Sequence, residues 1–223
     1  MTKPADPIAG LRMPLSEAME TQRSIRRLSP DPVDDEIILR LIELGTKAPT
    51  GSNFQNWEFV VIKDQTLKAR IGTLYEQAWK IYGRAGRALR KGDEAAARSM
   101  AAVEWQIEHF EEVPILIVAC LRGSRAPFLP VPPVVAATYY GSIFPSIQNI
   151  LLGARAMGLG AGIVTLPLWS TTRIRRLLKM PIAVLPCAIL PVGWPIGRYG
   201  PTHRRPPGEI THLDTYGNMP WKT

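Results

Sequence analysis

The chain has 223 residues, of which 46% are hydrophobic and 21% are charged, so wholesale disorder is excluded and a buried core is expected. Its 27 Lys and Arg residues outnumber 19 Asp and Glu residues, which gives a formal net charge of +8. The longest apolar run, Ile115 to Leu121, is far shorter than the about 20 residues that a membrane span requires. The basic excess indicates an anionic partner (nucleic acid, a lipid surface or a phosphorylated small molecule) or a solvated basic surface.

The beginning of the chain and its cysteines indicate the compartment. Residues 1–13 are broken by Pro4, Pro7 and Gly10 and contain no apolar stretch typical of a secretory signal. Two cysteines, Cys120 and Cys187, are too few for a disulfide framework or a zinc site. We therefore expect a cytoplasmic protein with no membrane partner and no metal.

Hydrophobic periodicity and turn residues predict helices that alternate with short apolar strands. Helices are expected at residues 15–22, 34–45, most of 66–110 with an interruption near 83–92, 139–157 and 172–180. Strands are expected at residues 58–63, 115–121, 163–164 and 187–193. Pro145 falls near the start of its helix, where proline is least costly. This order predicts a three-layer α/β or α+β domain.

The sequence contains no constellation for nucleophilic or metal-dependent catalysis. The glycines from Gly158 to Gly162 lack the G-x-G-x-x-G spacing and precede a strand, so we interpret them as a helix end that allows close packing. The histidines His109, His203 and His212 are not spaced like metal ligands. Because a G-x-S-x-G elbow and a P-loop are also absent, a hydrolase is disfavoured.

Basic and hydroxyl side chains gather at residues 22–27, Gln-Arg-Ser-Ile-Arg-Arg, directly after the first predicted helix. Two guanidinium groups and a serine hydroxyl suit a phosphate, because arginine forks match its oxygen atoms. The alternative is a basic patch at a helix end, where the helix dipole favours cations. The Arg-Arg-Pro-Pro run at residues 204–207 is either a second phosphate clamp or a charged tail.

A loop of small and amide residues, Pro-Thr-Gly-Ser-Asn-Phe-Gln-Asn-Trp at residues 49–57, leads into the first predicted strand. Amide groups both donate and accept hydrogen bonds, which suits the edge of a heteroaromatic ring. An ordinary Asx or serine turn is the competing interpretation. The basic set Arg173, Arg175, Arg176 and Lys179 belongs to a helix, and we interpret it as a solvated face.

The clusters at residues 22–27, 49–57 and 204–207 occur in a fixed order. Together with residues 158–167 they make the chain resemble the FMN-dependent nitroreductase family. The resemblance runs from about Leu15 to Ile210. It implies a single FMN-binding domain over residues 1–223 with the α+β, three-layer nitroreductase-like fold, in which helices flank a central mixed sheet. It also implies an intertwined homodimer with FMN sites at the interface, each built from both chains.

The resemblance assigns three groups of cofactor contacts: the FMN phosphate site, a loop from the partner subunit, and backbone beside flavin N5. The phosphate group comprises Gln22, Arg23, Ser24 and Arg26, joined by Arg204 and Arg205; the loop comprises Thr50, Gly51, Ser52, Asn53 and Gln55; the backbone segment is Thr165 and Leu166. Two positions depart from the family pattern. Gln22 stands where a second basic residue is usual, and Asn56 replaces the proline of Gln-Pro-Trp.

By this resemblance the chain is an FMN-dependent oxidoreductase that uses NADH or NADPH to reduce nitroaromatic, quinone or related acceptors by a ping-pong mechanism. The flavin carries the chemistry, which agrees with the lack of a catalytic side chain. Dehalogenase-like and dehydrogenase subtypes stay open, as does a non-catalytic FMN-binding sensor or partner-binding protein. Nucleic acid is disfavoured, because the sequence has no recognition-helix motif and no aromatic–basic interleaving.

Acceptor choice is expected in a mobile lid at about residues 75–112 and in the proline-rich stretch 122–133, whereas residues 206–223 are expected to form a tail. Aromatic side chains there can stack on a planar substrate, with helix packing as the competing role for all but the last. The candidates are Tyr75, Trp79, Tyr82, Trp105 and Phe128.

Overall fold

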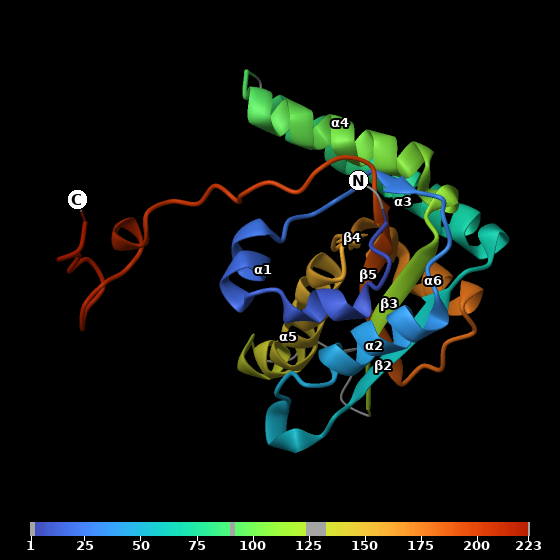
Figure 1. Cartoon of the computed structure of the whole chain (residues 1–223), viewed down its shortest axis with the longest axis horizontal. Coiled ribbons are helices and arrows are strands. Elements are labelled where there is room, and N and C mark those ends of the chain that lie inside the picture. Colours follow the sequence, from blue (N-terminus) through green and yellow to red (C-terminus); the bar gives the residue numbers. More distant parts are fainter. Residues whose placement is uncertain (1–2, 90–91, 124–132, 223) are drawn as a thin grey trace.

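Figure 1 shows the computed structural model, which describes residues 3–89, 92–123 and 133–222. The helices are α1 (Leu15–Thr21), α2 (Asp35–Gly45), α3 (Gln65–Leu89), α4 (Glu94–Glu108), α5 (Pro133–Ala156) and α6 (Thr171–Leu177). The strands are β1 (Leu28–Ser29), β2 (Trp57–Ile62), β3 (Ile115–Arg122), β4 (Gly160–Ala161) and β5 (Val184–Pro195).

The strands pair in the order β1-β5-β3-β2, and β4 also pairs with β5. At the centre, Val118 of β3 lies opposite Val60 of β2 on one side and Ile189 of β5 on the other. The pairings between these strands are all antiparallel, where the sequence predicted a mixed sheet. Continuous apolar strands are typical of parallel sheets, but here helices cover both faces of an antiparallel one.

Alternate side chains of β3 enter two separate hydrophobic clusters, which makes the domain three layers thick. Ile115 and Ile117 pack in the cluster that includes α2 and α5. Leu116 and Val118 pack in the cluster that includes residues of α3, α4 and α6. The predicted α+β arrangement of a central sheet flanked by helices is therefore confirmed.

Two predicted elements differ from the structure. Helix α5 begins at Pro133, not near residue 139, so Pro145 lies inside the helix and not near its start. The predicted strand at residues 163–164 is reduced to one bridge between Val164 and Ile189, and the regular pairing occurs earlier, in β4. The glycines that end α5 do allow close packing, because a Cβ at Gly160 would come within 2.6 Å of the Leu28 side chain.

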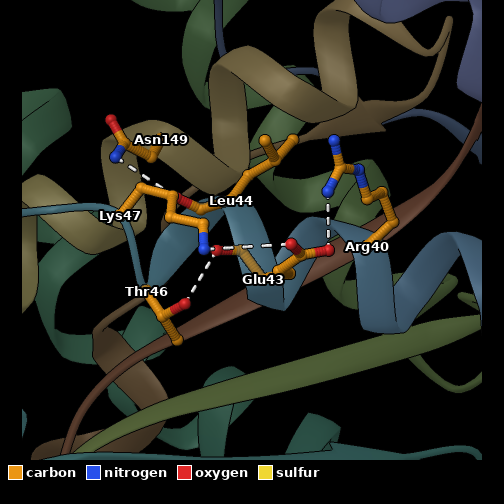
Figure 2. A network of polar contacts seen from close by, with 6 residues as sticks. All are labelled: Arg40, Glu43, Leu44, Thr46, Lys47 and Asn149. Carbon is orange, nitrogen blue, oxygen red and sulfur yellow. Dashed lines mark hydrogen bonds and ion pairs between the residues drawn. The ribbon is translucent and has the colours of Figure 1, made fainter.

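Figure 2 shows the polar contacts at the C-terminal end of α2, one of which joins this end to α5. Asn149 of α5 donates from Nδ2 to the Leu44 carbonyl at 3.3 Å, and the same carbonyl also accepts from the Lys47 N–H at 3.1 Å. Glu43 pairs with Arg40 at 2.6 Å, and the hydrogen bond and charge of Arg40 lower the pKa of that carboxyl. Within the described ranges, no helix is long and apolar enough to cross a membrane.

Candidate functional site

The segment from Gln22 to Arg27, here called the arginine segment, connects α1 to β1 and is held by its backbone. The Ile25 N–H donates to the Ala161 carbonyl of β4 at 3.0 Å. The Arg27 carbonyl accepts from the Ile196 N–H, directly after β5, also at 3.0 Å. The backbone is therefore fixed against the edge of the sheet at two points.

Polar side chains of the arginine segment lie beside two glycines, Gly162 and Gly200. Arg23 and Ser24 are exposed and Arg26 is half-buried. A Cβ at Gly162 would lie 3.5 Å from Ser24 Cβ, and one at Gly200 would lie 3.8 Å from an Arg23 guanidinium nitrogen. Among the described residues, neither arginine has an ion-pair partner. Two unpaired guanidinium groups and a hydroxyl beside bare backbone suit an anion such as a phosphate.

Tyr75 of α3 is buried close to Arg26. Burial raises the pKa of Tyr75 to about 12, and the charge of Arg26 opposes this shift. The Tyr75 hydroxyl lies 3.5 Å from Oε1 of Gln106, whose Nε2 is buried without a partner among the described residues. The phenol therefore stays protonated at neutral pH, and Gln106 retains an unused donor near the arginine segment.

Trp105 of α4 contacts the arginine segment from the other helix of this layer. The Arg27 guanidinium lies 5.9 Å from the centre of the Trp105 ring, a cation–π distance. Trp105 stacks in turn on His109, with ring centres 4.1 Å apart and planes inclined by 10°. The Trp105 ring therefore has two neighbours within this chain, and its role as a substrate residue stays a prediction.

Thr165 and Leu166 lie close to the arginine segment. Thr165 is exposed, and Leu166 begins the short 3-10 helix η4 (Leu166–Ser170). The turn is closed by the Leu168 N–H, which donates to the Thr165 carbonyl at 2.9 Å. Thr165 is three residues beyond Gly162, where a Cβ would lie 3.5 Å from Ser24 Cβ, so the chain between the two groups spans at most about 10 Å.

The third group, the loop from Thr50 to Gln55, lies against α5 instead. Its Gly51 N–H donates to Ser142 Oγ at 3.2 Å, and Gln55 N–H donates to the Thr50 hydroxyl at 3.2 Å. Three non-glycine residues of this loop have left-handed backbone: Ser52 (φ 52°), Asn53 (φ 52°) and Gln55 (φ 49°). In the described chain, no hydrogen bond joins this loop to the arginine segment.

Arg204 and Arg205 begin a C-terminal tail that runs away from the body of the chain (Figure 1). The last backbone bond to the body joins the Thr202 N–H to the Glu20 carbonyl at 3.0 Å. Arg204 is exposed and donates to the neighbouring His203 carbonyl at 2.8 Å. The structure therefore places neither arginine beside the predicted phosphate-binding residues of the same chain.

Two further predicted substrate residues, Trp79 and Tyr82, lie on α3. Trp79 is half-buried, lies with its Nε1 3.4 Å from Glu104 of α4, and lines an open cavity of about 750 Å3 between these helices. Tyr82 is 57% exposed, with its ring centre 6.1 Å from that of Trp79. Phe128 lies outside the described residues.

Ser142 and Gln106 contact predicted site residues, but the sequence did not identify either of them. Ser142 accepts from the Gly51 N–H, and its carbonyl accepts from Trp57 Nε1 at 2.9 Å. The partners of both residues lie far away in the chain, so no local sequence motif identifies either residue. Over the described ranges, no group of His, Cys, Asp and Glu could hold a metal ion.

The described chain is an α+β domain whose arginine segment is hydrogen-bonded to backbone at the edge of the sheet. The sequence model of the Nitroreductase family matches residues 19–194. This chain therefore belongs to the nitroreductase family. Proteins similar to it carry different activities.

Two kinds of curated relative illustrate this range. The chain is 30% identical over 180 residues to iodotyrosine deiodinase from Danio rerio, which covers 79% of this chain and 58% of that protein. It is 28% identical over 182 residues to 5,6-dimethylbenzimidazole synthase from Rhodospirillum rubrum, with 81% and 82% covered. The chain thus spans about three fifths of the length of the deiodinase.

Solved structures show the same fold. NfrA1 nitroreductase from B. subtilis superposes with a TM-score of 0.70 at 20% identity, over 92% of this chain and 75% of that one. Iodotyrosine deiodinase bound to FMN and 3-iodo-L-tyrosine superposes with a TM-score of 0.65 at 20% identity, over 92% of this chain and all (100%) of that one.

Proposed function

We propose that this protein binds FMN and is an oxidoreductase that uses NADH or NADPH to reduce nitroaromatic, quinone or related acceptors by a ping-pong mechanism. The observation that carries the proposal is that Arg23 and Arg26, which form no ion pair among the described residues, flank Ser24 on a backbone fixed at Ile25 and Arg27. Family membership and a similar structure that contains FMN support the same cofactor.

The arginine segment would hold the FMN phosphate. Arg23 and Arg26 supply charge, the Ser24 hydroxyl and the Gln22 amide supply further donors, and the absence of a side chain at Gly162 leaves room. The backbone at Thr165–Leu166 would lie along the ring. FMN, when bound, supplies the hydride chemistry at its N5 position, while this chain binds it, orients it and excludes water.

We further propose that two chains complete each site. Large apolar side chains on α1, α5 and the 50–55 loop are exposed in the single chain, and such surfaces are typical of interfaces. They are Leu15, Met19, Phe54, Val134, Tyr140 and Phe144. Association through them would carry the Thr50, Gly51, Ser52, Asn53 and Gln55 loop to the partner's arginine segment, and the tail with Arg204 and Arg205 would reach the same phosphate.

The α3–α4 region at about residues 75–112 is proposed as the lid over the acceptor. Trp79 and Tyr82 would contact the acceptor there, because Trp79 lines the open cavity and the Tyr82 side chain is exposed. The two unpaired, buried cysteines suit a reducing compartment such as the cytoplasm.

The absorption spectrum of the purified protein tests the cofactor. A flavin spectrum, with FMN released stoichiometrically on denaturation, is the expected result. A colourless protein that cannot be reconstituted with FMN would overturn the proposal. Size-exclusion chromatography with light scattering tests the dimer in the same preparation.

Stopped-flow mixing with NADH or NADPH separates an oxidoreductase from a non-catalytic FMN-binding sensor. Loss of flavin absorbance near 450 nm, in about the amount of bound flavin, is expected for the oxidoreductase. Reoxidation of that protein by a quinone, a nitroaromatic compound or 3-iodo-L-tyrosine then identifies the acceptor class. Flavin that neither nucleotide reduces would favour the sensor.

A further inference from the structure

A basic groove lies between α3 and α6, on different elements from the arginine segment. Its first part is a hollow of about 380 Å3 lined by Leu74 and Leu177 and by four cationic side chains. The cations are Arg70 of α3 and Arg173, Arg176 and Lys179 in and after α6. This set includes residues that the sequence analysis interpreted as a solvated helix face.

The groove continues into a second hollow of about 320 Å3 that has an aromatic wall. Leu74 and Arg173 line both hollows, so the two adjoin. The second hollow is lined further by Ile81 and by Trp169, whose side chain is 70% exposed. A charged end and an exposed indole therefore belong to one continuous surface.

The charges of this groove are not compensated within the described parts of the chain. No ion pair there involves Arg70, Arg173, Arg176 or Lys179. Other exposed helical cations do have carboxylate partners, such as Arg98 with Glu94 at 3.5 Å. Gathered like charges repel one another, so an anion that entered the groove would relieve the repulsion.

Local structure explains why α6 presents two of its arginines together. Ile174 is fully buried and anchors the helix to the core. Arg175 turns instead to the Pro181 carbonyl, to which it donates at 2.7 Å. Arg173 and Arg176 are spaced i,i+3 and share one helix face, and Arg173 is held across the groove by Gln77 of α3 at 3.0 Å.

We propose that this groove is a second ligand site, which binds a phosphorylated molecule with a flat ring, in chemical terms a nucleotide. The phosphates would lie among the four cations, because guanidinium groups match phosphate oxygens in two-pronged hydrogen bonds. The ring would stack on Trp169. The adjoining hollows have a combined size within the range of small-molecule sites.

The test is calorimetric titration of ATP into the protein with saturating FMN present, which keeps ATP away from the proposed cofactor site. Arg173→Ala with Arg176→Ala should weaken ATP binding about tenfold or more, because two charged hydrogen-bond donors are lost. Arg98→Ala, which also removes an exposed helical arginine, should leave it unchanged. Trp169→Ala should weaken ATP about fivefold or more but leave tripolyphosphate binding unchanged.

Three results would overturn the proposal. They are an absence of ATP binding by the wild type at millimolar concentration, equal affinity in the double variant and in Arg98→Ala, and binding of a single-stranded oligonucleotide without binding of ATP. Circular dichroism of each variant verifies folding, and Arg176→Lys, which keeps the charge but loses the two-pronged geometry, should retain only part of the affinity. FMN titration of the same variants separates this proposal from that for the cofactor.

Discussion

The arginine segment and the 50–55 loop are both predicted to contact one cofactor, but this chain builds them in opposite ways. The arginine segment is hydrogen-bonded to strand-end backbone on both sides and has Tyr75 and Trp105 behind it. The 50–55 loop has left-handed backbone at three non-glycine residues and lies on α5, with its side chains exposed. Backbone strain of this kind persists where surrounding structure or function maintains it.

The difference indicates a division of labour between the two regions. The arginine segment has the charge and rigidity of a phosphate site within one chain. The loop presents hydroxyl and amide groups outward, toward a region that this chain does not fill. In the proposed dimer each chain would contribute two half-sites, and variants in the two regions should behave differently.

The largest effect is expected from Arg23→Ala with Arg26→Ala. Hydrogen bonds to charged groups contribute about 1.5–3 kcal/mol each, so FMN affinity should fall about 100-fold or more with little change in unfolding temperature. Fluorescence titration of FMN measures this, and Arg98→Ala is the matched control. Stoichiometric FMN retention in the double variant would mean that the phosphate lies elsewhere.

The next effect is expected from Gly160→Ala, which tests the support of the arginine segment. The new Cβ would lie 2.6 Å from the Leu28 side chain and 2.8 Å from Ile25 Cγ2, so the segment must shift. Overpacking of this kind costs about 1–3 kcal/mol, and both unfolding free energy and FMN affinity should fall.

Gly86→Ala is the control for this glycine substitution. Its new Cβ meets only Met100 Cε at 3.9 Å, and it lies within α3. Alanine there should stabilise the helix by about 0.5–1 kcal/mol and leave FMN affinity unchanged. Equal behaviour of the two variants would contradict the supporting role of Gly160.

A smaller effect is expected from Ser142→Ala, which releases the 50–55 loop. Gly51 loses its acceptor at 3.2 Å, a loss of about 1 kcal/mol, while the Ser142 carbonyl keeps its bond from Trp57. FMN affinity should fall about fivefold, and the unfolding temperature should fall by about 2–4 °C. Ser99→Ala on α4 is the control, and a loss of unfolding temperature with unchanged FMN affinity would favour a core role for Ser142.

The smallest expected effect concerns the stability of the protein at high pH, where buried tyrosine and cysteine side chains ionise. Burial raises the pKa of Tyr75 from 10.0 to about 12, and those of Cys120 and Cys187 from 9.0 to about 12. Because these pKa values are higher in the folded state, their contribution is complete below about pH 9 and is lost as the pH rises through about 12. Urea unfolding at several pH values should show falling stability above pH 9.

Tyr75→Phe should flatten the part of this decline that begins near pH 10. The thiols of the folded protein should resist Ellman's reagent at pH 8 and react after denaturation, since both are buried. Stability that rises between pH 9 and 12 would contradict the assignment. No corresponding group lies in the 50–55 loop, so loop variants should leave this profile unchanged.

Local patterns predicted much of the fold. The bounds of α1, α2 and β3 agree with the sequence to within a residue or two, because their apolar spacing and turn residues act within each segment. The position of Pro145 inside α5 and the antiparallel pairing were not predicted, since packing between distant segments decides both. The same applies to the site: the arginine segment is a local motif, whereas Ser142 contacts Gly51 from 91 residues away.

In the proposed dimer, the C-terminal tail described above would link cofactor binding to protein concentration. After Thr202 its polar contacts are internal, such as the Leu213 N–H to the Asn218 carbonyl at 2.8 Å. It carries apolar side chains into solvent, with Tyr216 95% and Trp221 53% exposed. If a second chain covers them, mass action requires that dilution release both the tail and the bound cofactor, so FMN would leave most readily from dilute protein.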